Sequence, residues 1–180
     1  MKTTVTTCAA LLCAIAAVTL LRSPRPASAT SARLPDLVRE IRVYQRQTWH
    51  WQSVRGAVKT RAAQTPPAKA SADYQLWVRN LWRRRALAER RIALRPPHRA
   101  EWQCIHRYEG AWDARTGNGY YGGLQMDISF QRHYAGRLLR RKGTADHWTP
   151  LEQMWAAEHA HRSGLGFTPW PNTARFCGLI

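Results

Sequence analysis

Acidic residues are scarce in this chain of 180 residues, which has 11 Asp and Glu against 28 Lys and Arg and a formal net charge of +17. The imbalance is local, because residues 30–100 carry 16 basic and 4 acidic side chains whereas residues 101–180 carry 9 and 7. Residues 101–180 therefore do not have the basic character of a nucleic-acid-binding domain.

Long apolar runs are absent after residue 21, so no later segment is expected to cross a bilayer. Before it, Lys2 precedes an apolar stretch over 5–21, and the Ala-Ser-Ala triplet at 27–29 has the small residues that a signal peptidase accepts. This pattern predicts a signal peptide over 1–29 and export of the mature chain. An uncleaved anchor is the alternative, because about 17 apolar residues approach the length of a membrane span.

Cysteine is also scarce, with four residues in all. Removal of a signal over 1–29 leaves Cys104 and Cys177, and in an exported chain an even number most simply forms one disulfide. The bond would close a loop of about 73 residues and stabilise the fold by about 4 kcal/mol. Two unpaired buried thiols are the alternative, which an oxidising compartment disfavours.

A basic helical region is predicted over 30–97. Residues 34–58 repeat apolar side chains at helical spacing, with arginines between them and Gly56 as the expected break. Residues 64–71 hold two prolines and several small residues, which predicts a linker. Residues 72–94 predict a second basic helix.

A compact domain is predicted over 98–180, with no internal repeat. Its expected elements are a helix over 100–108 ended by Gly110, a small hairpin with its tight turn at 116–119, helices over 127–139 and 150–163, and an irregular tail. The predicted fold class is therefore α+β, mostly α, with one short hairpin.

The segment 104–125 is the most informative part of the chain. Glu109 lies at the expected helix end between Tyr108 and Trp112, ahead of a glycine-rich aromatic turn. An acid in apolar surroundings beside a sugar-sized groove is what cleavage of a glycosidic bond needs. Burial and the negative end of the helix dipole would favour the protonated acid, whereas Arg107 would oppose both effects.

The second half resembles the resuscitation-promoting factor core, a lysozyme-like group of actinobacterial peptidoglycan-cleaving enzymes. The residues that carry this resemblance are Cys104, Trp112, the run Thr116-Gly-Asn-Gly-Tyr-Tyr-Gly-Gly-Leu-Gln125, and the tail Trp170-Pro171…Cys177-Gly178. It covers about residues 100–180 and implies a small lysozyme-like fold and a Cys104–Cys177 disulfide. It further implies a single catalytic glutamate and the glycan strands of the cell wall as substrate.

The position of the glutamate departs from the family pattern. In the family it directly follows the cysteine, whereas here Ile105 follows Cys104 and Glu109 precedes Trp112 by three positions rather than five. A gapless alignment would put Arg107 at the catalytic position, and a guanidinium cannot act as the acid at any useful pH. We therefore assign Glu109 as the acid, with a local shift of two residues.

Glu109 is expected to protonate the oxygen that bridges N-acetylmuramic acid and N-acetylglucosamine. Either water completes a hydrolysis, or the muramic C6 hydroxyl attacks and leaves a 1,6-anhydro sugar. Asp113 and Asp127 could act as a second carboxylate, but a structural or solvent-facing role is expected for each. A catalytically inactive lysozyme-like module that binds the cell wall is the alternative function.

Other residues of the domain are expected to bind substrate. They are Thr116, Tyr120, Gln125 and Trp170. Thr116 and Gln125 can hydrogen-bond sugar groups, while Tyr120 and Trp170 are assigned either to sugar stacking or to the core. Gly122 and Gly123 are expected to keep the floor of the groove clear of side chains.

No metal site and no cofactor are expected, because the chain has no His-Glu-x-x-His and His159 and His161 diverge on a helix. Outside the membrane, the basic region is expected to meet anionic wall polymers or a membrane surface rather than nucleic acid. A solvated spacer is the alternative. The sequence thus predicts a secreted, wall-associated monomer.

Overall fold

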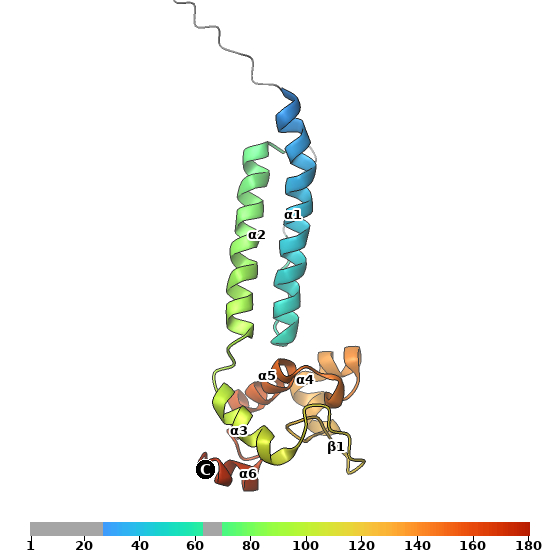
Figure 1. Cartoon of the computed structure of the whole chain (residues 1–180), viewed down its shortest axis with the longest axis vertical. Coiled ribbons are helices and arrows are strands. Elements are labelled where there is room, and N and C mark those ends of the chain that lie inside the picture. The colour runs from blue at the N-terminus through green and yellow to red at the C-terminus, as the bar shows by residue number, and fades with distance from the viewer. Residues whose placement is uncertain (1–26, 63–69) are drawn as a thin grey trace, which may run out of the picture.

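The computed structural model of this protein describes residues 27–62 and 70–180 (Figure 1). Its elements in chain order are α1 (Ala27–Val54), α2 (Ala72–Ala93), α3 (Arg99–Glu109), β1 (Tyr120–Tyr121), β2 (Met126–Asp127), α4 (Ile128–Lys142), η1 (Ala145–His147), α5 (Pro150–Ala160), η2 (His161–Leu165) and α6 (Pro171–Phe176). The predicted class, α+β and mostly α, is confirmed. The predicted signal peptide over 1–29 and the predicted linker over 64–71 lie largely outside the described residues.

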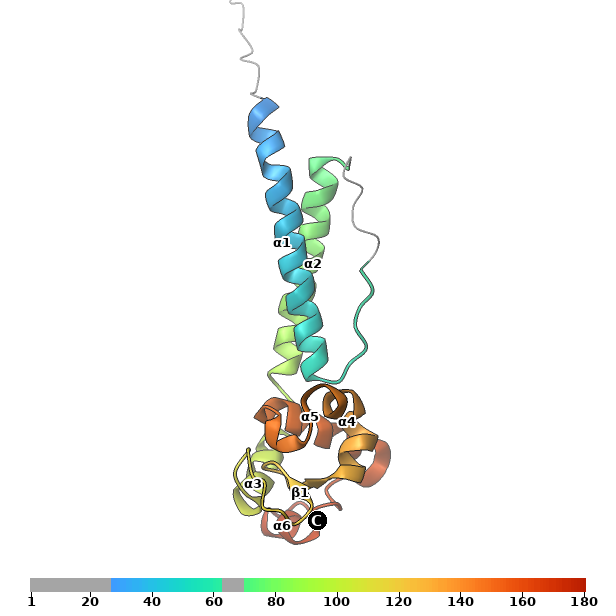
Figure 2. The ribbon, with the colours of Figure 1, turned by 90° about the vertical axis from the view of Figure 1, so that its right-hand side faces the viewer.

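The first two helices lie side by side and form a two-helix rod that stands on the rest of the molecule (Figures 1 and 2). Ile41, Val78 and Trp82 make a buried apolar seam between them, because each helix repeats apolar side chains on one face. Two ion pairs with N–O distances of 2.6 Å add to it, Arg79–Glu40 and Arg55–Glu89.

The ends of the rod differ slightly from the prediction. Helix α1 begins at Ala27 rather than at residue 34 and ends at Val54 rather than at residue 58. Its C-terminal end is set by Gly56, whose φ of +67° is a left-handed conformation that a helix does not continue through. The predicted second helix over 72–94 agrees with α2.

The globular part is built around α5, which is buried on nearly all sides. Its core includes Trp102 and Ile105 from α3, Leu124 from the turn of the hairpin, Met154 from α5, and Trp170. Helix α5 ends at Ala160, earlier than the predicted residue 163, and continues as the short π-helical turn η2. Helix α4 ends at Lys142, three residues later than predicted, and is interrupted at Ala135.

The hairpin is present, but its ladder is not closed by the predicted turn. Strands β1 and β2 pair antiparallel through Tyr120↔Asp127 and Tyr121↔Met126, so the connecting turn is 122–125. Residues 116–119 form a second reversal, between the bridged residues Arg115 and Tyr121. Both reversals depend on left-handed backbone, which Gly117, Gly119 and Gly122 supply with φ values of +80°, +88° and +74°.

The C-terminal tail was predicted to be irregular and is instead helical over α6. Proline at the first position of α6 has a φ suited to a helix start, and it needs no N–H partner there. A disulfide joins Cys104 of α3 to Cys177 just after α6, with a Cα–Cα distance of 6.0 Å. The disulfide holds α6 against α3.

The rod meets the globular part on α5. Val54 and Ala93, at the ends of the two rod helices, are buried against Trp155 of α5. The Trp155 indole N–H donates to the carbonyl oxygen of Ala93 at 2.9 Å. Helix α6 lies at the end of the globular part that faces away from the rod (Figures 1 and 2).

Candidate active site

Glu109 is the last residue of α3 and follows the buried Trp102 and Ile105 by seven and four residues, so it lies on the same face of the helix at its C-terminal end. Its carboxylate is half-buried, and Oε1 accepts a hydrogen bond of 2.8 Å from the Thr173 hydroxyl of α6. Thr173 is only 7% exposed, and its hydroxyl is closer to Glu109 Oε1 than to its other acceptor, the Trp170 carbonyl oxygen at 3.3 Å. The acid is therefore held in place by a segment 64 residues away in sequence.

Gln125 lies against the same helix end. A Cβ built on Gly110 would be 3.8 Å from the Gln125 amide nitrogen. That nitrogen donates to the carbonyl oxygen of Gly122 at 2.8 Å, and Gln125 adopts a left-handed φ of +46°. Three segments thus meet around Glu109: the end of α3, the 122–125 turn, and α6.

Two exposed aromatic side chains lie next to this meeting point. Tyr108 is 58% exposed and Phe176 is 72% exposed, with their ring centroids 5.6 Å apart. Phe176 follows Thr173 by three residues on α6, so both share the face turned toward α3. The sequence interpretation that Tyr108 buries Glu109 is therefore wrong, because Tyr108 extends into solvent beside the acid.

Thr116 and Tyr120 lie at the surface of the hairpin. Tyr120 is 46% exposed, and its backbone N–H donates to the Asn118 side-chain oxygen at 3.0 Å. Thr116 is also exposed. Neither side chain hydrogen-bonds to Glu109 in the part of the chain that the structure describes, so their predicted contact with substrate stays a prediction.

Trp170 is not a sugar platform. It is 4% exposed, and its indole N–H donates to the carbonyl oxygen of Leu124 at 2.6 Å. Its ring packs edge-on against Trp102 and Phe130, with centroid distances of 5.2 and 5.5 Å. A large aromatic ring whose polar atom finds a buried partner is better placed in a core than at a surface, so the predicted stacking role is corrected.

Gly122 and Gly123 are also corrected, since they do not line a groove floor. Both are buried, and a Cβ on Gly122 would approach the Gln153 side-chain oxygen to 2.5 Å. A Cβ on Gly123 would lie 2.5 Å from His106 Nδ1 and 2.8 Å from the Trp112 ring. Glycine is required here because the turn packs directly on α3 and α5.

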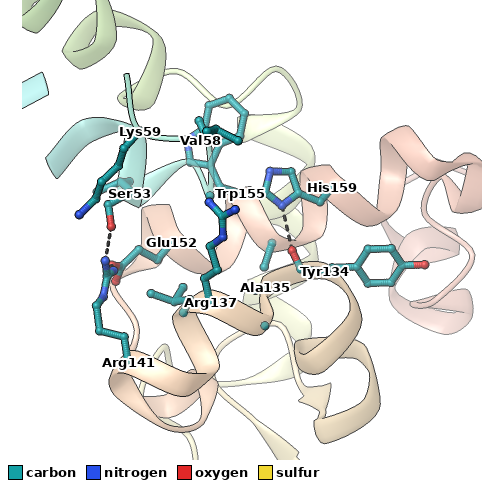
Figure 3. A pocket seen from close by; sticks show the side chains of 16 residues that line it. Ser53, Val58, Lys59, Tyr134, Ala135, Arg137, Arg141, Glu152, Trp155 and His159 are labelled. Carbon is teal, nitrogen blue, oxygen red and sulfur yellow. Dashed lines mark hydrogen bonds and ion pairs between the residues drawn. The ribbon is translucent and has the colours of Figure 1, made fainter. Parts of the chain in front are cut away.

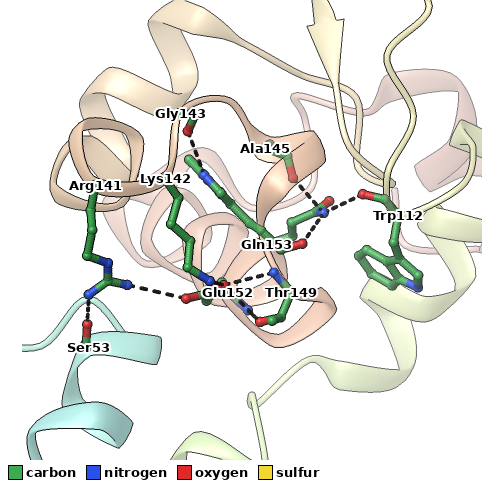
Figure 4. A network of polar contacts seen from close by, with 10 residues as sticks. Ser53, Trp112, Arg141, Lys142, Gly143, Ala145, Thr149, Glu152 and Gln153 are labelled. Carbon is green, nitrogen blue, oxygen red and sulfur yellow. Dashed lines mark hydrogen bonds and ion pairs between the residues drawn. The ribbon is translucent and has the colours of Figure 1, made fainter.

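Gln153 is a positioning residue that the sequence analysis missed. It is fully buried in α5, and its side-chain oxygen accepts from the Gly123 N–H at 2.8 Å. Its amide nitrogen lies within hydrogen-bond distance of the carbonyl oxygens of Trp112, Ala145 and Trp148, at 2.7, 2.9 and 3.1 Å (Figure 4). The Gln153 side chain thus connects the 122–125 turn to α5.

Thr173 was missed as well, although a sequence signal existed. Glu109 follows Cys104 by five residues, and Thr173 precedes Cys177 by four. A disulfide between these cysteines brings the two helix segments together, so polar residues one turn from each cysteine are candidates for contact. The C-terminal tail contributes this hydroxyl to the site, although the sequence predicts no helix there.

Of the two candidate second carboxylates, one is exposed and the other caps a helix. Asp113 is exposed. Asp127 caps α4, and its Oδ1 accepts from the Phe130 backbone N–H and the Ser129 hydroxyl, both at 2.7 Å. The Phe130 N–H, followed by the Ser129 hydroxyl, lowers the pKa of Asp127 below its usual value. Asp127 is therefore ionised near neutral pH and engaged in the fold.

Among residues 27–62 and 70–180, no group of three or more His, Cys, Asp and Glu side chains is arranged to hold a metal ion. The buried carboxylate of Glu158 has a structural environment instead. It accepts hydrogen bonds from the His98 backbone N–H at 2.8 Å and from the Trp102 indole N–H at 2.9 Å. These bonds tie the start of α3 to α5. No helix in the described ranges is long and apolar enough to span a membrane.

Parts of this chain are similar to known proteins. Residues 97–173 match the model of the family described as Transglycosylase-like domain. The chain is 32% identical over 82 residues to resuscitation-promoting factor Rpf1 of Corynebacterium glutamicum, a match that covers 44% of this chain and 41% of the relative. It is 37% identical over 76 residues to resuscitation-promoting factor RpfE of Mycobacterium tuberculosis, with 41% of each chain covered.

The chain thus aligns with about two fifths of the length of these curated relatives. The resemblance seen in the sequence is confirmed, since residues 97–173 are similar to the transglycosylase-like domain family and parts of the chain are similar to resuscitation-promoting factors. The rod lies outside the residues that match the family model.

Proposed function

We propose that this protein cleaves peptidoglycan glycan strands between N-acetylmuramic acid and N-acetylglucosamine, with Glu109 as the general acid. The observation that carries the proposal is the fixed Glu109 carboxylate, held by Thr173 where α3, the 122–125 turn and α6 meet. The similarity to a transglycosylase-like domain and to resuscitation-promoting factors supports the same substrate class.

Glu109 donates its proton to the bridging glycosidic oxygen as the bond to the muramic C1 breaks. Thr173 donates to Oε1, which leaves Oε2 as the oxygen that carries the transferable proton. The oxocarbenium-like centre at C1 is then captured by water, or by the C6 hydroxyl of the same sugar to form the 1,6-anhydro ring, and in either case the attacking oxygen gives its proton to the Glu109 carboxylate. The second route needs no second carboxylate, in keeping with the exposed Asp113 and the capping role of Asp127.

Tyr108 and Phe176 are proposed as the stacking surface for a sugar ring beside the acid. Their rings are close to one another and more than half exposed, on the two elements that carry Glu109 and Thr173. The apolar faces of pyranose rings pack on such surfaces, and the ring atoms are otherwise unburied. Thr116, Tyr120 and Gln125 would hydrogen-bond the sugar groups from the hairpin side.

The rod is proposed to lie along an anionic surface of the cell envelope, after export directed by residues 1–29. Arg84 and Arg91 follow Trp77 at seven-residue intervals, so the three share one outward face of α2. Trp77 is 55% exposed and both arginines are exposed. Replacing both arginines with glutamine should weaken salt-sensitive sedimentation with purified cell walls and leave the folded rod intact.

Mass spectrometry of the fragments that the protein releases from purified peptidoglycan tests which glycosidic bond is cleaved and whether water or the C6 hydroxyl completes the reaction. The expected products are disaccharide-peptides cut after N-acetylmuramic acid. Hydrolysis leaves a reducing end, whereas the 1,6-anhydro product is lighter by one water, about 18 Da. Sedimentation with the wall but no soluble fragments would identify a catalytically inactive wall-binding module instead.

A further inference from the structure

A cavity of about 670 Å³ lies between the C-terminal end of α1 and the globular part (Figure 3). Its walls are the segment 53–59, the middle of α4 and one face of α5. None of the residues proposed for catalysis or sugar binding lines it. The volume is within the range of about 300–1,000 Å³ that is typical of small-molecule sites.

Basic side chains dominate the polar part of this cavity. Lys59, Arg137 and Arg141 line it, and Glu152 is its one acidic lining residue. Glu152 is already neutralised, because its oxygens lie 3.4 Å from the Arg141 guanidinium and 2.7 Å from the Lys142 ammonium group. Within the described residues, Lys59 and Arg137 form no ion pair with a carboxylate. The cavity therefore keeps two positive charges that the protein does not neutralise.

The floor of the cavity is apolar. Trp155, Ala156 and Leu138 are buried beneath it, with Trp155 only 2% exposed. Val58 also lines the cavity and is 75% exposed (Figure 3). A hydrophilic anion such as inorganic phosphate would gain nothing from this floor, whereas an acidic group joined to an apolar body would use both parts of the site.

Local backbone features give the cavity a fixed shape. Helix α4 departs from helical geometry at Ala135, with φ −142° and ψ 32°, in the wall of the cavity. His159 Nδ1 lies 2.9 Å from the Tyr134 carbonyl oxygen, which joins α5 to α4 just before this break. On the other side, Gly56 lies so close to His159 that a Cβ would come within 2.6 Å of the ring. These contacts hold the three walls of the cavity together.

We propose that this cavity binds a small organic anion, in which a carboxylate, phosphate or sulfonate group is joined to an apolar body. Lys59 and Arg137 bind the acidic group, and Trp155, Leu138 and Val58 contact the apolar body. The site is independent of Glu109 and does not rest on the proposed function. Its occupant would stabilise the contact between rod and globular part, because the cavity has a wall from each.

Two fluorescent probes that differ in one acidic group test this proposal on the full chain. Anilinonaphthalenesulfonate carries the sulfonate, and N-phenylnaphthylamine is its neutral counterpart. The variant Lys59→Gln/Arg137→Gln should weaken binding of the sulfonate about tenfold, since a charge-assisted hydrogen bond is worth about that factor, and leave the neutral probe unaffected. The matched control, Arg83→Gln/Arg90→Gln at two other exposed arginines of α2, should change neither affinity.

A second variant fills the cavity and leaves its charges in place. A Cβ on Gly136 would have only the Arg140 guanidinium within 4 Å, at 3.6 Å, so Gly136→Leu has room and favours the helix. We expect it to abolish binding of both probes, and inorganic phosphate not to displace the sulfonate. Equal sulfonate binding by wild type and Lys59→Gln/Arg137→Gln, or by wild type and Gly136→Leu, would overturn the proposal.

Discussion

The two-helix rod and the globular part hold themselves together by different means. In the rod, three buried apolar residues and two partly exposed ion pairs join the helices, and most arginines point outward. The globular part has a disulfide, several buried tryptophans and a buried glutamine whose side chain reaches four backbone groups. The disulfide and the Thr173 hydrogen bond hold the end of α3 that carries Glu109, and a general acid, the role proposed for Glu109, must be held in position.

The difference also separates two kinds of recognition. The outer face of α2 offers charge and a few exposed apolar side chains along a helix, which suits an extended anionic surface. The region around Glu109 offers one fixed acid, a fixed hydroxyl and an aromatic pair, which suits one sugar linkage. The following changes should affect one part and spare the other.

Removal of the disulfide should have the largest effect. The double variant Cys104→Ala/Cys177→Ala opens a loop closed over 73 residues and should lower the free energy of unfolding of the globular part by about 4 kcal/mol. Near-ultraviolet circular dichroism, which reports the buried tryptophans, should show the loss at lower temperature. The rod contains no disulfide in the described residues, so equal loss of its helical signal in the far ultraviolet would contradict the comparison.

Two buried glutamines provide a matched pair. Gln153→Ala leaves the Gly123 N–H without its partner and should cost about 3 kcal/mol, and it should slow cleavage because it frees the turn beside Gln125. Gln52→Ala, in the rod, breaks bonds to Thr60 and Glu89 that water can replace in part, and should cost about 1 kcal/mol. Urea unfolding measures both. A larger loss of unfolding free energy for Gln52→Ala than for Gln153→Ala would contradict the view that the globular part depends more on its buried polar contacts than the rod does.

Helix caps give a smaller effect that depends on pH in one part only. Asp127→Ala removes the cap of α4 and Ser71→Ala that of α2, each at a cost of about 1 kcal/mol near neutral pH. Because the pKa of Asp127 is lowered in the folded state, its stabilisation is present above the unfolded pKa and is lost as pH falls through the folded value. In melting curves, the loss of melting temperature that Asp127→Ala causes relative to wild type should therefore be smaller at about pH 2 than at about pH 7. The loss that Ser71→Ala causes should be the same at both pH values.

His161 should give the smallest effect. Burial, followed by the positive charge of His98, lowers the pKa of His161 below its usual value. The unfolded chain then takes up the proton first as pH falls, so stability should decrease slightly from about pH 7.5 to about pH 5.5. The variant His161→Gln should show a flatter dependence of melting temperature on pH over this range, and an unchanged slope would exclude His161 as the cause.

Elements with strong local patterns could be predicted from the sequence. The second rod helix was placed within a residue because arginines and apolar residues alternate at helical spacing and prolines follow it. The Cys104–Cys177 bond followed from the cysteine count and from the family resemblance. Glu109 lies at a helix end as predicted, and its role as the acid stays a prediction.

Features that depend on tertiary contact could not be predicted in the same way. The Thr116–Gly119 turn has a clear local signal, yet the ladder closes through 122–125 because Gly122 and Gly123 pack on Gln153 and His106. Trp170 looks the same in sequence whether it stacks on a sugar or fills a core. Only its contact with the Leu124 carbonyl decides the matter. The cavity beside Lys59 joins segments about 80 residues apart, for which the sequence has no pattern.

The central claim is that the carboxylate of Glu109 supplies the proton that breaks the glycosidic bond. Its most direct test is the initial rate at which soluble fragments leave purified peptidoglycan, for wild type, Glu109→Gln and the exposed control Asp113→Asn, all with unchanged circular dichroism. We predict a loss of about a hundredfold or more for Glu109→Gln, as expected when a general acid is removed, and a rate within about twofold of wild type for Asp113→Asn. A Glu109→Gln protein that releases fragments as fast as wild type would contradict the account.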